Sequence, residues 1–195
     1  MDIFLEENDY VDFSADNIRK LSHTLFDSLT DDGERIRAAY EFVDTRIPHS
    51  ADIGADILPF KASDVLSAGT GICFAKSNLL AALLRSVNIP TGFVYQFLTL
   101  SDKDDSLGYS FHGLNAVKYN GRWLYLDARG ARKAVFSLTE PRTAFDIRSE
   151  YGEYTAEGIY GRQDSAITEL FGRISSRREL WENLPQKLNG KPDII

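Results

Sequence analysis

Residues 69–90, GTGICFAKSNLLAALLRSVNIP, decide the fold of this chain. Apolar residues recur there at intervals of three and four, as one face of a helix requires, namely Leu79, Leu80, Leu83, Leu84 and Val87. Asn88-Ile89-Pro90 ends the pattern, because proline cannot continue a helix. We therefore expect a helix that Thr70 or Gly71 caps and that holds Cys73 in its first turn.

Cys73 is the only cysteine in 195 residues, so it cannot form a disulfide within the chain. In the first turn of a helix, unpaired backbone N–H groups and the positive end of the helix dipole favour the thiolate over the thiol. A free cysteine also commonly serves as a small buried hydrophobe. The position at a helix start favours a nucleophile over that structural role.

Two later segments alternate like strands, 111–119 (FHGLNAVKY) and 122–128 (RWLYLDA). Between them lies Asn120-Gly121, the strongest short-range signal for a two-residue hairpin turn. We therefore expect an antiparallel hairpin in which Tyr119 faces Arg122.

The same register places a histidine beside an aspartate. Counting back from the turn, Leu114 faces Asp127, and His112 shares the face of Leu114 because it lies two residues away. His112 and Asp127 then form a diagonal pair about 7–8 Å apart at the backbone. Asp127 could accept the Nδ1 proton of His112 and stabilise the imidazolium formed when Cys73 loses its proton. Taken singly, His112 could instead be a core histidine and Asp127 a residue that ends a strand.

Residues 71–90 with the downstream His112 and Asp127 resemble the core of the transglutaminase-like superfamily. In that family a G-x-C helix is followed by an L-L-R-x-x-G-I-P boundary, a histidine strand and an aspartate strand. The resemblance covers about residues 34–130 and implies a papain-like α+β fold, with the nucleophile helix packed on an antiparallel sheet. It also implies Cys73 as the nucleophile, His112 as the general base and Asp127 as the residue that orients the histidine.

Three departures from the family pattern concern other positions. Asn88 replaces the usual glycine before Ile-Pro, Gly92 stands where an arginine is common, and Ala128-Arg129 follows the aspartate. The resemblance therefore supports the fold better than it supports any particular substrate.

The composition fits one soluble domain over residues 1–195. The resemblance implies a core at about 34–130 within it, with an N-terminal helix before the core and a C-terminal helical extension after it. The chain is 43% hydrophobic, which is enough for a single sizeable core. Its 29 acidic and 22 basic residues give a net charge of −7, which argues against general nucleic-acid binding. The start MDIFLEE lacks the regions of a signal peptide, and no stretch approaches the ~20 apolar residues of a membrane span. We expect a cytoplasmic protein that has no membrane partner.

Periodicity places the remaining elements. We expect a helix over 14–29 capped by Ser14, a break at 31–33, a second helix over 34–47 and a buried strand over 91–100. Residues 164–184 are expected to be helical. The segment 48–70 is expected to be an irregular wall or lid of the site.

Two polar side chains are candidates for substrate contacts. Gln96 lies in a buried-looking strand and could donate to an oxyanion, although satisfying backbone groups is an equally ordinary role. The backbone N–H of Cys73 is the simpler oxyanion donor. Arg129 could bind a substrate carboxylate or form an ordinary ion pair.

The sequence predicts no metal and no cofactor. Residues 102–106 resemble half a calcium loop, but Gly113 stands at position twelve where a bidentate glutamate belongs. Neither His23 nor His49 has a cysteine or second histidine at zinc-ligand spacing.

These patterns predict a cysteine-dependent hydrolase or acyltransferase that attacks amide bonds and forms a thioester intermediate. Water would resolve the thioester in a peptidase, amidase or deamidase, and an amine would resolve it in a transglutaminase. We favour hydrolysis of a protein or peptide substrate, or of a small amide. The alternatives are amine transfer and a binding module that has kept the fold without turnover.

Overall fold

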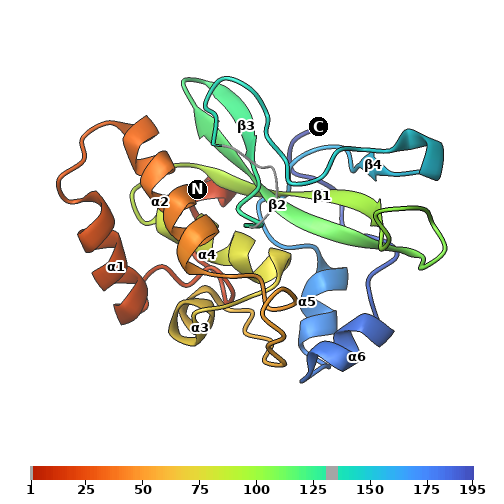
Figure 1. The fold of residues 1–195 in the computed structure, drawn as a ribbon. Helices are drawn as coiled ribbons and strands as arrows, with labels where there is room; N and C mark the ends of the chain where they lie inside the picture. The colour runs from red at the N-terminus through yellow and green to blue at the C-terminus, as the bar shows by residue number, and fades with distance from the viewer. Residues whose placement is uncertain (1, 131–135) are drawn as a thin grey trace.

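The computed structural model describes residues 2–130 and 136–195. It confirms the α+β fold, with helices packed around and beneath an antiparallel sheet (Figure 1). The helices are η1 (Ile3–Leu5), α1 (Asp16–Phe26), α2 (Asp32–Arg46), α3 (Ala62–Ala68), α4 (Cys73–Arg85), η2 (Ser149–Tyr151), α5 (Ser165–Phe171) and α6 (Arg177–Glu182). The strands are β1 (Thr91–Thr99), β2 (Tyr109–Tyr119), β3 (Arg122–Leu126) and β4 (Tyr154–Thr155).

Helix α4 is the centre of the fold, as the sequence predicts. Every residue from Phe74 to Arg85 is buried, and only Cys73 at the start of the helix is partly exposed. The helix is enclosed on all sides, and its buried polar residues Lys76, Asn78 and Arg85 donate to backbone carbonyl oxygens of the surrounding chain. Helices α2 and α3 contact one side of α4, and strands β1 and β2 contact the other.

The expectation that Thr70 or Gly71 caps α4 is wrong. Ile72 occupies the N-cap in an extended conformation, and its side chain makes no capping hydrogen bond. The Thr70 hydroxyl instead donates to the carbonyl oxygen of Pro48 at 2.8 Å, and Gly71 pairs with His49 in an isolated parallel bridge. The residues before α4 therefore bind the segment after α2, and among the described residues no side chain caps the start of α4.

The sheet has the order β3-β2-β1-β4, with antiparallel neighbours throughout. The hairpin between β2 and β3 forms as expected, because Asn120 and Gly121 both adopt the positive φ that this turn requires, 48° and 77°. Tyr119 pairs with Arg122, which confirms the register. Strand β3 ends one residue before Asp127, so Asp127 begins the segment that leaves the sheet.

The ends of the N-terminal helices differ from expectation. Ser14 does not cap α1, because its backbone N–H donates to the Glu7 carboxylate and Ala15 occupies the N-cap without a side-chain bond. Asp31, expected in a break, caps α2 by accepting a hydrogen bond from the backbone N–H of Glu34 at 3.0 Å. An aspartate at this position satisfies a backbone donor that has no partner within the helix.

Two further expectations are corrected by short helices. The segment 48–70, expected to be irregular, contains α3, whose seven residues are too few to give a clear helical period. The expected helix over 164–184 is two helices, α5 and α6, because the chain breaks at Gly172 and Ser176 caps the second helix. Figure 1 shows these two helices beside the end of the sheet where β1 turns into β2.

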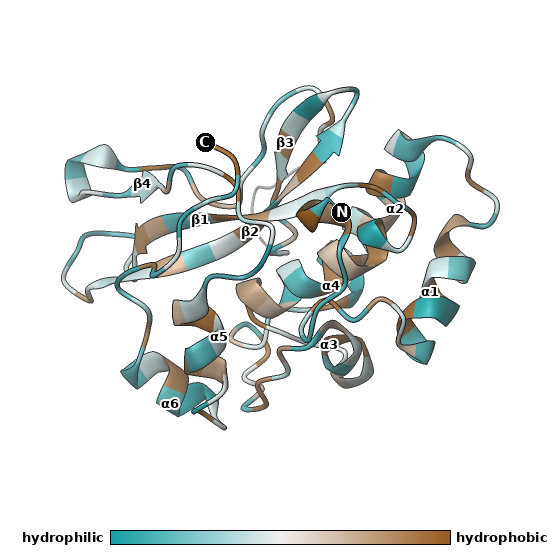
Figure 2. Cartoon of the chain, turned by 180° about the vertical axis from the view of Figure 1, so that it is seen from behind, coloured by the Kyte–Doolittle hydropathy of each residue, from teal (hydrophilic) through white to brown (hydrophobic). Residues whose placement is uncertain are grey.

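Both faces of the sheet are covered. The larger apolar cluster fills the space between the helices and one face, and a smaller one lies on the other face around Phe4, Val94 and Leu114. Figure 2 shows α1 at the outside of the molecule and, along the central α4, hydrophilic turns mixed with apolar ones. Over the described part of the chain, no helix combines the length and the apolar character needed to cross a membrane.

Candidate active site

Cys73 lies where α4 begins, with its sulfur against strand β2. The backbone N–H of Gly113 and the side chain of His112 face the sulfur, and both lower the pKa of the thiol. Cys73 as a residue is partly exposed, unlike the rest of α4. Cys73 therefore combines a helix N-terminus, a backbone donor and an imidazole neighbour with access from outside.

His112 and Asp127 form the buried pair that the hairpin register predicts. His112 Nε2 lies 2.8 Å from Asp127 Oδ2, and the two residues are 7% and 1% exposed. The expectation that Asp127 binds Nδ1 is wrong. The outer ring nitrogen, Nε2, reaches the neighbouring strand end, and Nδ1, nearer the backbone, is left for the thiol. The aspartate thus holds the proton of His112 on Nε2.

The same carboxylate oxygen has a second donor that the sequence did not reveal. The backbone N–H of Ala144 donates to Asp127 Oδ2 at 2.8 Å, and the Phe145 ring packs edge-on against His112 with the ring centroids 4.9 Å apart. The segment that contains Ala144 and Phe145 therefore folds back over the histidine. No local sequence pattern specifies a backbone donor that arrives from 17 residues away.

The electrostatics of the three residues favour an ion pair. Burial raises the pKa of the Cys73 thiol, but the hydrogen bond from His112 and its positive charge outweigh burial, so the pKa lies below its usual value. Burial lowers the pKa of His112, but the Asp127 charge and hydrogen bond outweigh this and raise the pKa well above its usual value. Both shifts stabilise thiolate and imidazolium together.

Gly113 allows the helix and the strand to approach this closely. A Cβ at this position would lie 2.5 Å from Cδ1 of the buried Phe74 ring. Because Phe74 follows Cys73 directly, the absence of a side chain at Gly113 sets the distance between the start of α4 and strand β2.

A buried lysine fastens the loops around the site. Lys76 is 1% exposed, and its Nζ donates to the carbonyl oxygens of Ile47 at 2.6 Å and Arg129 at 3.2 Å. Burial lowers the pKa of Lys76 to about 8. The ammonium group therefore joins α4 to the chain before His49 and to the chain after Asp127.

A cavity of about 190 Å³ opens at Cys73. Apolar side chains from the sheet and from the C-terminal region form most of its wall: Phe74, Leu98, Leu100, Phe111, Phe145, Leu180, Trp181 and Leu184. Its polar part comes from His49, Thr99, Asp102, Ser110, His112, Arg129 and Arg177. The contribution of α6 was not foreseen from the sequence, since α6 reaches the site only through the tertiary fold.

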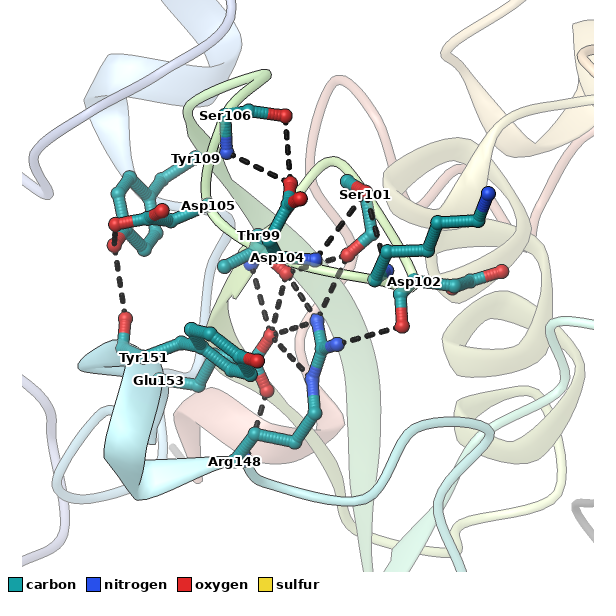
Figure 3. A network of polar contacts seen from close by, with 11 residues as sticks. Thr99, Ser101, Asp102, Asp104, Asp105, Ser106, Tyr109, Arg148, Tyr151 and Glu153 are labelled. Atoms are coloured by element: carbon teal, nitrogen blue, oxygen red, sulfur yellow. Dashed lines mark hydrogen bonds and ion pairs between the residues drawn. The ribbon is translucent and has the colours of Figure 1, made fainter.

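A polar network holds one side of this cavity in place. Arg148 and Glu153 form an ion pair at 2.6 Å, and Glu153 also accepts hydrogen bonds from the backbone and hydroxyl of Thr99 (Figure 3). Arg148 donates in addition to the carbonyl oxygens of Ser101 and Asp102. The loop that joins β1 to β2 is therefore fixed beside the cavity it lines.

The two predicted substrate contacts have different outcomes. The Arg129 guanidinium lines the cavity but forms a two-pronged ion pair with Asp52, at 2.6 and 2.8 Å, as the ordinary alternative supposed. Gln96 lies opposite His112 in the sheet and is buried, but it is not among the residues that line the cavity. Its Oε1 has no hydrogen-bond partner within the described ranges.

The other residues considered from the sequence have ordinary surroundings. In the 102–106 loop, Asp104 accepts hydrogen bonds from the backbone and hydroxyl of Ser106. His23 lies 3.1 Å from Asp27 on the exposed side of α1, beside a hollow of about 540 Å³ that is separate from the cavity at Cys73. Within residues 2–130 and 136–195, no three His, Cys, Asp or Glu side chains gather as a metal site would require.

A model of the transglutaminase-like superfamily matches residues 19–128. No curated protein sequence matches the chain. A candidate cysteine protease from Cytophaga hutchinsonii has a similar structure, with a TM-score of 0.52 and 20% identity over 65% of this chain and 40% of its own. A structure described as a TGase gives 0.45 and 17% identity over 64% of this chain and 34% of its own. The chain thus spans less than half the length of either structure, and the first likeness shows the fold alone.

Proposed function

Because this chain belongs to the transglutaminase-like superfamily, we propose that it is a cysteine-dependent enzyme that attacks amide or related acyl groups through Cys73. The observation that carries the proposal is the buried pair of His112 and Asp127 beside a partly exposed cysteine at a helix start. A cysteine, a base and a group that orients the base are the parts of an activated nucleophile. A thiol kept only for packing would not need a lowered pKa.

In the proposed reaction the Cys73 thiolate attacks the carbonyl carbon while His112 carries the proton that the thiol gave up. The C–S bond forms and the carbonyl electrons move to oxygen. When they return, the C–N bond breaks and His112 gives the proton to the leaving amine, which leaves a thioester on Cys73. Throughout, Asp127 keeps the other proton on Nε2 and stabilises the imidazolium.

Hydrolysis is the proposed fate of the thioester. Water attacks it with His112 as the base, and the thiol and a carboxylic acid are released. A cavity of about 190 Å³ is close to the size of one side chain, so we favour water over a bulky amine as acceptor. Its apolar wall favours an acyl donor with an aromatic or branched aliphatic side chain, within a protein, a peptide or a small amide.

The test compares wild type with Cys73→Ala on N-acetyl-phenylalanine amides and on matched N-acetyl-aspartate amides, with products identified by mass. We expect free acid from the phenylalanine substrate, a thioester adduct on the wild-type chain and neither product with Cys73→Ala. A primary amine added to the reaction distinguishes the alternatives, because amine adducts in excess over acid would indicate a transferase. Equal turnover by Cys73→Ala would contradict the proposal.

A further inference from the structure

His49 lies beside the nucleophile and takes no part in the reaction described so far. It follows α2 and pairs with Gly71, two residues before Cys73, in a short parallel bridge. The backbone N–H of Ser50 donates to the Gly71 carbonyl oxygen at 3.1 Å and reinforces this contact. Two backbone segments therefore hold His49 next to the start of α4.

The hydrogen bonding of His49 fixes which nitrogen carries its proton. The backbone N–H of Ala51 donates to His49 Nδ1 at 3.3 Å, so Nδ1 is the acceptor of the ring. A neutral imidazole that accepts at Nδ1 carries its hydrogen on Nε2. No described residue accepts a hydrogen bond from Nε2.

The surroundings keep the ring neutral. Burial is the largest cause, and the positive charges of Arg129, Lys76 and His112 act in the same direction, whereas Asp52 opposes them. Together they lower the pKa of His49 to about 3. At neutral pH the ring is therefore a fixed donor that neither gives up its proton nor forms an ion pair with the thiolate.

His49 and Cys73 line the same cavity. We propose that His49 Nε2–H donates a hydrogen bond to the oxygen that becomes negative when Cys73 attacks a carbonyl group. The backbone N–H of Cys73, which has no acceptor within its own helix, supplies the second donor. This assignment replaces Gln96, which does not line the cavity. The inference rests on the proposed acyl-transfer chemistry.

A neutral donor suits this position. It stabilises charge on the substrate oxygen during the attack, yet it does not compete with His112 for the thiolate beforehand. Interactions that are stronger in the transition state than in the ground state are those that accelerate a reaction.

The test uses two small reagents that differ in whether an oxyanion forms. Attack of Cys73 on p-nitrophenyl acetate passes through a tetrahedral oxyanion, and its collapse breaks the C–O bond, releases p-nitrophenolate and leaves an acetyl thioester. Alkylation by iodoacetamide forms a C–S bond and expels iodide without an oxyanion. Both rates depend on the thiolate, so their ratio isolates stabilisation of the oxygen. Subtracting the rate of Cys73→Ala removes acetylation at other residues.

His49→Phe keeps a ring of similar size but removes the donor. We expect it to lower the acetylation rate on the order of 100-fold, while the alkylation rate and its pH profile stay within about twofold of wild type. His49→Gln, which restores an N–H donor, should recover part of the loss. His23→Phe makes the same change on the exposed side of α1 and should leave both rates unchanged.

The outcomes separate this inference from the proposed function. If wild type releases no p-nitrophenolate in a Cys73-dependent reaction, the proposed function fails and the role of His49 fails with it. If wild type is acetylated and His49→Phe retains the wild-type ratio of the two rates, only the role of His49 is overturned. Because both rates come from one preparation, a partly unfolded variant lowers both and leaves the ratio intact.

Discussion

Replacing Gly113 with alanine should disturb stability and reactivity together. The new Cβ would lie 2.5 Å from Cδ1 and 3.1 Å from Cε1 of Phe74. Carbon atoms rest about 3.5–4.0 Å apart, so the helix and the strand must separate by about 1 Å or the ring must move. The ring has little room, because it is 1% exposed and packs near Tyr95 and Phe171.

Such overpacking of a filled core costs about 1–3 kcal/mol. The strain also falls on the residue that carries the thiol, because Phe74 adjoins Cys73 in α4. A shift of about 1 Å at a reacting group can lower a rate ~100-fold. We therefore expect Gly113→Ala to be less stable and to react more slowly with iodoacetamide at pH 6, since the thiol would move away from His112 and the Gly113 N–H, which lower its pKa.

Urea unfolding gives the change in stability, and labelling of the folded protein gives the change in reactivity. Gly172→Ala is the matched control, because its Cβ would meet nothing closer than 3.5 Å and its φ is −71°. That variant should stay within about 0.5 kcal/mol of wild type. If Gly113→Ala matched the control in both measurements, the close approach of α4 to β2 would not position Cys73.

Three further changes test other parts of the site. Asp127→Asn can still accept both hydrogen bonds that Oδ2 receives, from His112 and Ala144, but it loses the charge. The urea midpoint should therefore change little. The pH at which the rate of Cys73 alkylation rises should move upward. Trp181→Ala removes a half-exposed part of the cavity wall, 51% exposed, so KM for apolar acyl donors should rise with the iodoacetamide rate unchanged. Glu153 has a pKa lowered to about 2, and burial opposes this shift while hydrogen bonds to Arg148 and Thr99 produce it. Its contribution to stability is therefore complete above about pH 4.5 and disappears as pH falls toward 2. In Glu153→Gln the urea midpoint should accordingly depend less on pH over that range than in wild type.

The parts of the site that local signals encode were predictable from the sequence. The spacing of leucines and the Asn88-Ile89-Pro90 stop predict α4, and Asn120-Gly121 alone predicts the register that brings His112 beside Asp127. A two-residue turn fixes every pair that follows from it, so an error of one residue would have placed the two side chains on opposite faces.

The parts that depend on contacts distant in sequence were not predictable. The Ala144 N–H that holds Asp127 and the α6 wall of the cavity come from the chain beyond the hairpin, and backbone donors carry no residue signature. His49 was considered only as a metal ligand, because nothing local shows that Gly71 holds it beside Cys73. The nitrogen by which His112 meets Asp127 was also assigned wrongly, since pairing register does not determine the orientation of a ring.

The rate of iodoacetamide alkylation of Cys73 as a function of pH tests the central claim most directly. The pKa of Cys73 is lowered and that of His112 is raised, so thiolate and imidazolium coexist between the two apparent values. We predict a step in rate well below the value of about 8.5 for a free cysteine, and an upward shift of that step in His112→Ala. A step near 8.5 that does not respond to His112→Ala would leave Cys73 an ordinary thiol and would contradict the account.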